Sequence, residues 1–125
     1  MSTSELTPEE IAIYRQGAIR LLEQTRPQRE ARQKRGWELA KLAAAFLKEE
    51  FKTTKVVAFG SLVREDCFHL WSDVDIAAWD ISPQDTFRAI DAVWQLDDEM
   101  EINLVDVNAC KPAILASIEK EGVEL

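Results

Sequence analysis

The stretch "AFGSLVREDCFHLWSDVDIAAW", residues 58–79, decides the fold of this chain. A short apolar run ends in a Gly-Ser pair, Gly60 and Ser61. Two aspartates, Asp73 and Asp75, follow in a second apolar run and are separated by one residue. Alternate residues of a strand point to the same face, so these two carboxylates share a face with their Cβ atoms about 7 Å apart. We therefore predict a strand that carries two neighbouring carboxylates.

Outward from this stretch, the hydrophobic pattern predicts helices and strands in the order ααβ(α)βαβα. Thr7 and Pro8 have the pattern of an N-cap followed by a first helical residue, and Pro27 interrupts the helix that they begin. The other expected elements are a helix at about 28–51, strands at 55–60, 73–80 and 100–107, helices at 82–96 and 111–122, and a short edge strand from 123. The expected fold class is α/β or α+β, with a small mixed sheet flanked by helices.

We divide the chain into an N-terminal helical extension, residues 1–54, and a sheet-containing domain, residues 55–125. On the second helix, an apolar stripe at helical spacing is expected to face the core. Its members are Leu39, Leu42, Ala43, Phe46 and Leu47.

Composition bounds the class of protein. The 125 residues are 46% hydrophobic and 30% charged, which indicates one folded domain rather than a disordered chain. No apolar run approaches the roughly 20 residues of a membrane span, and the N-terminus lacks the apolar region of a secretory signal. Cys67 and Cys110 have no metal-binding spacing, so we expect them to be reduced, buried thiols in a cytoplasmic protein.

Charge is distributed unevenly along the chain. Residues 1–54 carry a net charge of +2 and residues 55–125 a net charge of −10. The acidic part would repel a nucleic-acid backbone, so no direct nucleic-acid partner is expected. Within the basic part, the run from Arg26 to Arg35 is either a solvated helix face or a contact for phosphate or an acidic partner surface.

The residues around the two aspartates have the chemistry of a site for metal ions and phosphate. Two like charges side by side on a strand are costly to ionise, and a divalent cation shared by both removes that cost. Mg²⁺ prefers such oxygen ligands, together with water and substrate phosphates. Gly60 lets the backbone approach a ligand closely, Ser61 begins a possible helical turn, and Arg64 could reach a phosphate oxygen.

A strand, a Gly-Ser pair, a loop and a strand-borne Asp-x-Asp resemble the nucleotidyltransferase superfamily that includes DNA polymerase beta. The likeness is strongest to its minimal bacterial members, the MNT proteins, and covers about residues 55–125. It implies that Gly60 and Ser61, with Arg64, hold a nucleoside triphosphate such as ATP. It also implies that Asp73 and Asp75 bind two Mg²⁺ ions and act in catalysis.

The third carboxylate of that family is not at its usual place. This chain reads "INLV", so Asn103 stands where an aspartate is expected on the third strand. We assign the missing catalytic and metal-binding role to Asp106, which a bulge or a strand end could bring to the site. Glu101 is the alternative on the face of Asn103. A further alternative is a site with two acids, in which catalysis is weak or lost.

The resemblance also implies a partner. Only 18 residues follow residue 107, too few for an acceptor-binding domain, so the acceptor is expected to be another molecule. Minimal members are typically encoded beside HEPN proteins, which are all-α ribonuclease toxins. The implied function is that of an antitoxin which transfers AMP from ATP to a tyrosine hydroxyl of a HEPN toxin in a hetero-oligomer. The alternative is an inactive nucleotidyltransferase fold that neutralises its partner by binding.

Two aromatic residues near the aspartates have an open role. His69 lies in the loop before them, where a lone histidine is more often exposed to solvent than catalytic. Trp71 directly precedes "SDVD" and could stack on an adenine ring or lie at the rim of the core.

Overall fold

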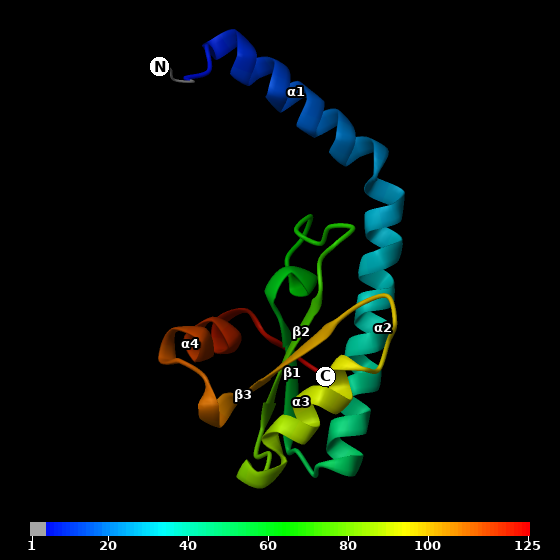
Figure 1. The fold of residues 1–125 in the computed structure, drawn as a ribbon, viewed down its shortest axis with the longest axis vertical. Coiled ribbons are helices and arrows are strands. Elements are labelled where there is room, and N and C mark those ends of the chain that lie inside the picture. The colour runs from blue at the N-terminus through cyan, green and yellow to red at the C-terminus, as the bar shows by residue number, and fades with distance from the viewer. Residues whose placement is uncertain (1–4) are drawn as a thin grey trace.

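The computed structural model describes residues 5–125 and has a four-stranded sheet at its centre (Figure 1). The helices are α1 (Pro8–Gln24), α2 (Arg26–Glu50), α3 (Thr86–Trp94) and α4 (Pro112–Glu121). The strands are β1 (Lys55–Phe59), β2 (Val74–Trp79), β3 (Ile102–Asp106) and β4 (Val123–Glu124). Short 3-10 helices lie between them: η1 (Gly60–Val63), η2 (Pro83–Asp85) and η3 (Val107–Ala109). The expected mixed fold of helices and a small sheet is confirmed.

The sheet is mixed, with the strand order β3-β2-β1-β4. Strand β1 is antiparallel to both β2 and β4, while β2 and β3 are parallel. The register pairs Phe59 at the end of β1 with Asp75, and Asp75 with Asn103. The end of β1 and the first residues of β2 and β3 therefore meet at one end of the sheet.

Helix α2 packs across one face of the sheet and belongs to its main core. Its buried side chains share one cluster with Val56 and Ala58 of β1 and with apolar residues of β2, β3 and α3. The buried α2 residues of this cluster are Leu39, Ala40, Ala43, Ala44 and Leu47. Residues 1–54 were expected to form a helical extension, but α2, which makes up the second half of it, packs as one unit with the sheet.

The stripe expected on α2 is correct except at one position. Leu42 is 52% exposed, and Phe46 is half-buried at the border of the core. Ala43 of the predicted stripe is buried together with the small residues Ala40 and Ala44, so the backbone of α2 lies close to the sheet. Gly36 makes the same close approach, because a Cβ there would lie 2.9 Å from Leu62.

Helix α4 covers the opposite face of the sheet. Ile118 of α4 is buried with Val57 and Ala77 in a second, smaller cluster. Gly122 ends α4 as expected, and a Cβ at this position would clash with the side chain of Val57. On β2 the odd-numbered side chains, such as Ala77, point toward α4. The even-numbered side chains, such as Ile76, point toward α2.

Three local expectations need correction. Helix α2 begins before Pro27, because a proline in the first helical turn needs no N–H partner. The helix expected from 82 begins as the 3-10 helix η2 at Pro83, and α3 starts only at Thr86. Of the two thiols expected to be buried, Cys67 is exposed and Cys110 half-buried, and both are free.

Helix α1 extends away from the rest of the molecule (Figure 1). Thr7 caps it as predicted, with its side chain accepting a hydrogen bond from the backbone N–H of Glu10 at 3.1 Å. None of the α1 residues is buried. Among the described residues, none of the helices combines the length and the apolar character that a membrane span requires.

The packing of α2 predicts unequal effects of two leucine substitutions on the same helix. Leu39→Ala should lower the free energy of unfolding by about 2–5 kcal/mol, because it opens a cavity in the core. Leu42→Ala should cost less than about 0.5 kcal/mol, because that side chain is largely exposed. Urea denaturation of both variants measures the difference, and equal losses would contradict the observed face of α2.

Candidate active site

The Gly-Ser turn and the Asp-x-Asp segment meet at one end of the sheet. Gly60 and Ser61 begin η1 directly after β1, and Asp73 and Asp75 flank the first residue of β2. Asp75 lies opposite Phe59, the residue before Gly60. The antiparallel pairing of β1 with β2 therefore brings together two motifs that are eleven residues apart along the chain.

Gly60 packs directly against the carboxylate of Asp75. The backbone of Gly60 has φ +75°, a conformation that residues with a Cβ rarely adopt. A Cβ at this position would lie 2.7 Å from Oδ2 of Asp75. Glycine is thus required both for the turn after β1 and for space beside the aspartate.

The surroundings of Asp75 make its carboxyl group costly to ionise. Burial raises the pKa of its carboxyl group, and the charge of Asp73 raises it further. Asn103 opposes these effects by donating a hydrogen bond from Nδ2 to Oδ1 of Asp75, at 3.4 Å. A positive charge placed between the two aspartates would remove their mutual repulsion. The carboxylate pair therefore fits a hard divalent cation such as Mg²⁺.

Protein ligands for such a cation are few. Within residues 5–125, no three His, Cys, Asp or Glu side chains are grouped closely enough to hold a metal ion. Magnesium sites commonly use one or two carboxylates and take their other ligands from water and substrate phosphates. Asp73 and Asp75 are sufficient for a site of that kind.

Asp106 does not lie with the other candidate residues. The β2–β3 register continues without a bulge to pair Ala78 with Asp106, three residues beyond the pair formed by Asp75 and Asn103. An odd number of residues along a strand turns the side chain to the opposite face. Asp106 is 6% exposed there and accepts hydrogen bonds from Thr86 Oγ1 at 2.7 Å and from the backbone N–H of Asn108 at 3.0 Å. We therefore assign Asp106 a structural role between β3, α3 and η3 and omit it from the site.

Glu101 remains the nearest alternative for a third acid. It directly precedes β3, and its backbone oxygen accepts a hydrogen bond from the N–H of Val74 at 3.0 Å. Its side chain is exposed and, by strand alternation, lies on the face of Asn103.

The two residues expected to bind phosphate differ in their surroundings. Ser61 is half-buried near the start of η1, a helix of only four residues. Arg64 is turned to α4 and donates to Oε2 of Glu121 from Nη2 at 2.7 Å and from Nε at 3.0 Å. This hydrogen bond raises the pKa of Arg64. A phosphate would have to replace Glu121 as the partner of this arginine.

Helix α2 supports the site through two residues that the sequence did not single out for this role. Arg32 donates a hydrogen bond from Nη2 to the backbone oxygen of Ser72, the residue before Asp73, at 2.9 Å. Gln33 donates to the backbone oxygen of Leu62 in η1, also at 2.9 Å. The basic run from Arg26 to Arg35 was the only signal for these contacts, and it does not identify which side chain reaches which loop.

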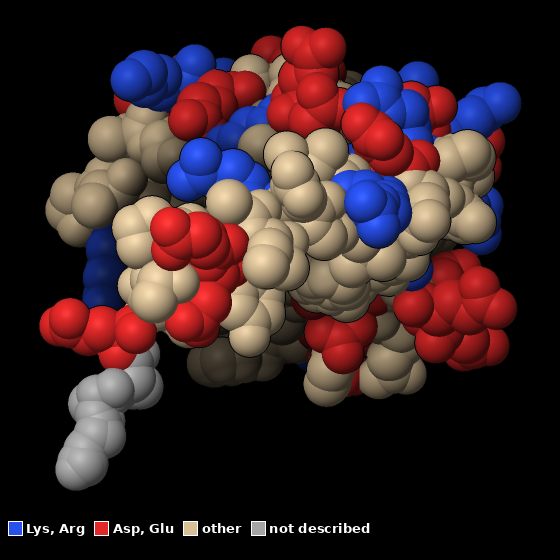
Figure 2. All heavy atoms as spheres, turned by 90° about the horizontal axis from the view of Figure 1, so that it is seen from above, with Lys and Arg blue, Asp and Glu red and all other residues tan. Residues whose placement is uncertain are grey.

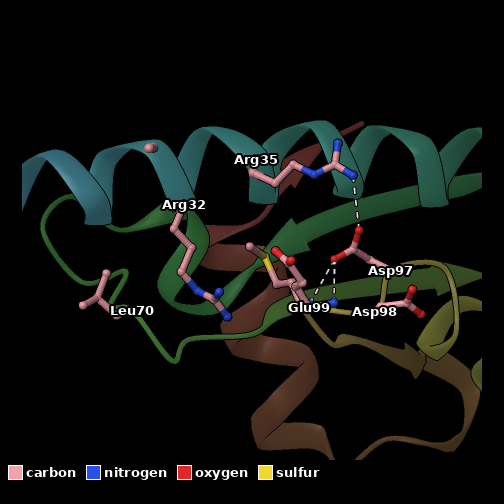
Figure 3. Close-up of a pocket in the computed structure, with 8 residues that line it drawn as sticks. Arg32, Arg35, Leu70, Asp97, Asp98 and Glu99 are labelled. Atoms are coloured by element: carbon pink, nitrogen blue, oxygen red, sulfur yellow. Dashed lines mark hydrogen bonds and ion pairs between the residues drawn. The ribbon is translucent and has the colours of Figure 1, made fainter.

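A pocket of about 640 Å³ lies between α2 and the turn that precedes β3 (Figure 3). Arg32 and Arg35 project from α2 toward the turn that precedes β3, and Arg35 forms an ion pair with Asp97 at 3.2 Å. Burial raises the pKa of Asp97, but hydrogen bonds from the backbone of Glu99 and Met100 and from Arg35 lower it overall. Asp97 therefore stabilises the turn that leads into β3.

The loop before Asp73 carries an exposed aromatic pair. The rings of His69 and Trp71 stack at 5.3 Å between centroids, and Trp71 is 76% exposed. Trp71 is thus not part of the core, and its face is open to a ligand or to another protein.

The chain matches no protein-family model, and a search of curated proteins finds no significant match.

The raised pKa of Asp75 predicts that removing its charge stabilises the protein without metal. Ionised Asp75 destabilises the fold above its raised pKa, and this cost disappears as the pH falls below the ordinary value of 3.8. Asp75→Asn keeps a hydrogen-bond acceptor for Asn103 and should raise the melting temperature at pH 7 by a few degrees. The gain should vanish near pH 3, as thermal unfolding in the presence of EDTA would show.

The control for this experiment is Asp91→Asn, which neutralises an exposed carboxylate of α3. It should leave the melting temperature nearly unchanged at both pH values. A loss of stability in Asp75→Asn at pH 7 would contradict the proposed cost of ionisation.

Proposed function

We propose that this protein is a Mg²⁺-dependent nucleotidyltransferase that transfers AMP from ATP to a tyrosine hydroxyl of a HEPN-type toxin and so acts as an antitoxin. One observation carries the proposal: Gly60 packs on Asp75 at the end of the sheet where Asp73 and Ser61 also lie. An ordinary protein surface has no need for a half-buried carboxylate beside a second acid and a glycine turn.

Each residue has a role in this reaction. Asp73 and Asp75 would hold the metal, which when bound offsets the negative charge of the triphosphate. Gly60 keeps the turn close to Asp75, and the half-buried Ser61 would donate its hydroxyl to a phosphate oxygen. The acceptor oxygen forms a bond to the α-phosphorus, and pyrophosphate leaves as the bond between the α- and β-phosphates breaks.

Loss of the proton from the acceptor hydroxyl is the step that the site supports least. Asn103 cannot accept a proton near neutral pH, because an amide is not a base. Glu101 is the remaining acid on this face, and its exposed side chain is free to approach an acceptor. We therefore expect transfer to be slow, or to depend on a group of the acceptor protein.

The partner would act in the same compartment. Two free thiols, one of them exposed, agree with a reducing cytoplasm. The protein would form a hetero-oligomer with its toxin, and its acidic second part would favour encounter with a basic partner surface.

Co-expression with the product of the adjacent open reading frame tests the transfer. Intact-mass spectrometry should show a partner heavier by one or more AMP groups with the natural chain. The Asp73→Ala, Asp75→Ala double variant should leave the partner mass unmodified, and Asp91→Asn should behave like the natural chain. A partner modified equally by the double variant would rule out the proposed site.

A second function, neutralisation by binding alone, is favoured by Asn103. This residue replaces the third carboxylate and donates a hydrogen bond to Asp75, while Asp106 is turned to the other face. A partner that co-purifies at unmodified mass, and is neutralised by the double variant without ATP, would establish this function instead.

Asn103→Asp tests whether the missing carboxylate limits the reaction. It supplies a group that can hold metal or accept a proton, so the rate of AMP transfer should rise by about 10²-fold, the usual size of general-base effects. Without metal it should lower the melting temperature, because it adds a third like charge beside Asp75. Asn108→Asp, the same change on exposed η3 and outside the site, should leave the rate of AMP transfer unchanged. An unchanged rate in Asn103→Asp would show that this position does not limit transfer.

A further inference from the structure

Helix α1 has no role in the site and no partner within the described part of the chain beyond its junction with α2. All of its residues are exposed, including large apolar ones. The exposed apolar residues on and beside it are Leu6, Ile11, Ile13, Tyr14, Ile19, Leu21 and Leu22. A helix of 17 residues that packs on nothing is only marginally stable in water. Another surface must therefore cover α1 in the working protein.

The direction of α1 is set at its junction with α2. Arg29 of α2 is buried there and donates from Nη2 to the backbone oxygen of Leu22 at 2.5 Å. Its Nε donates to Thr25 Oγ1 at 3.3 Å. These bonds hold the end of α1 to α2 and leave the rest of α1 projecting. Figure 2 looks down on the end of the molecule that carries α1. It shows a continuous tan area of uncharged residues, with charged residues mostly around it.

The residues of α1 form a seam suited to one other helix. Ile11, Tyr14, Ala18 and Leu21 follow one another at intervals of three, four and three, the spacing of the contact positions in a two-helix coiled coil. Gly17 borders this seam, and a Cβ there would meet nothing within 4 Å. Small residues at the middle of the seam allow a second helix to approach closely.

We propose that α1 pairs with α1 of a second copy of this chain in an antiparallel, two-fold symmetric contact. A two-fold axis at the level of residue 16 places Ile11 opposite Leu21 of the second copy, and Tyr14 opposite Ala18 of the second copy. Each pair occurs twice, as an isologous contact requires. In every layer of the seam, the combined size of the two side chains is then similar.

A parallel pair would not fill the seam evenly. It would place Tyr14 against Tyr14 and Ala18 against Ala18, so an overfilled layer would lie beside an underfilled one. Both overpacking and cavities destabilise a helix contact. The order of large and small residues along α1 therefore favours the antiparallel arrangement.

The same arrangement fills a pocket at the junction of α1 and α2. This pocket, of about 160 Å³, is lined mainly by apolar side chains of the α1 end and of the loop before Asp73, among them Leu21, Leu22, Leu70 and Trp71. In the antiparallel pair, Leu6 of the second copy lies within one helical turn of this junction. Leu6 is itself 50% exposed. The contact would thus extend from α1 to the loop that leads into the site.

The size of the contact predicts a weak dimer. A helix of 17 residues is about 26 Å long, so two such helices bury on the order of 1,000 Å² in total, the lower end for specific interfaces. We expect the dimer to dissociate on dilution. This inference does not depend on the proposed function.

Sedimentation velocity of the full chain tests the pairing. The mass should approach twice 14.2 kDa at high micromolar concentration and fall toward 14.2 kDa on dilution. Ile11→Arg should remain monomeric, because it places a charge in the seam. Ile13→Arg is the matched control, since Ile13 is 68% exposed but lies off the seam, and it should still dimerise. Because no α1 residue is buried, both variants should keep the main unfolding transition of the natural chain.

Disulfide cross-linking tests the direction of the helices. In a background with Cys67→Ser and Cys110→Ser, a mixture of the Tyr14→Cys and Ala18→Cys variants should form mixed cross-links more readily than either variant with itself. Self-cross-links of the Tyr14→Cys variant alone would indicate a parallel pair. A chain that stays monomeric at every concentration, or one whose dimer is lost equally in Ile13→Arg, would overturn the proposal and leave a different protein as the occupant of α1.

Discussion

The contact between Gly60 and Asp75 is the constraint on which the functional end of this molecule depends. The glycine allows β1 to turn directly into η1 beside the carboxylate, with only 2.7 Å between the position of a Cβ and Oδ2 of Asp75. No other residue type satisfies both the positive φ of 75° and this lack of space. Asp75 is half-buried beside this turn, and its burial raises the pKa of the carboxyl group.

The rest of the fold supports this costly arrangement. Helix α2 contributes the densest part of the core on one face, and from the same helix Arg32 and Gln33 hold the two backbone segments that flank the site. Helix α4 packs on the other face, where the aspartates point. The aspartates are therefore positioned at the end of a sheet that is packed on both faces.

The chemistry of the site depends on which face of β3 carries an acid. Asn103 lies beside Asp75, and Asp106 lies on the opposite face with Thr86. An amide at that position preserves a hydrogen bond to Asp75 but supplies neither negative charge nor a base. The two proposed functions, AMP transfer and neutralisation by binding, differ chiefly in one respect. Transfer needs Glu101 or the partner protein to supply the base that Asn103 cannot provide.

The sequence by itself determined most of the secondary structure and the shared face of Asp73 and Asp75, because both follow from local rules. Period-two alternation marks β2 and β3, proline and capping residues mark the start of α1, and strand alternation already placed Asp106 opposite to Asn103. Only a bulge could have changed that, and the regular β2–β3 register excludes one.

Tertiary structure alone decided which apolar residues are buried and which polar side chains meet. Leu39 and Leu42 have equal helical propensity and both belong to apolar stripes, yet only Leu39 faces the sheet, because alanines bring that side of α2 closest to it. The contacts of Arg64 with Glu121 and of Arg32 with Ser72 join residues 57 and 40 positions apart. Such contacts depend on how layers pack in space, and no local pattern in the chain encodes them.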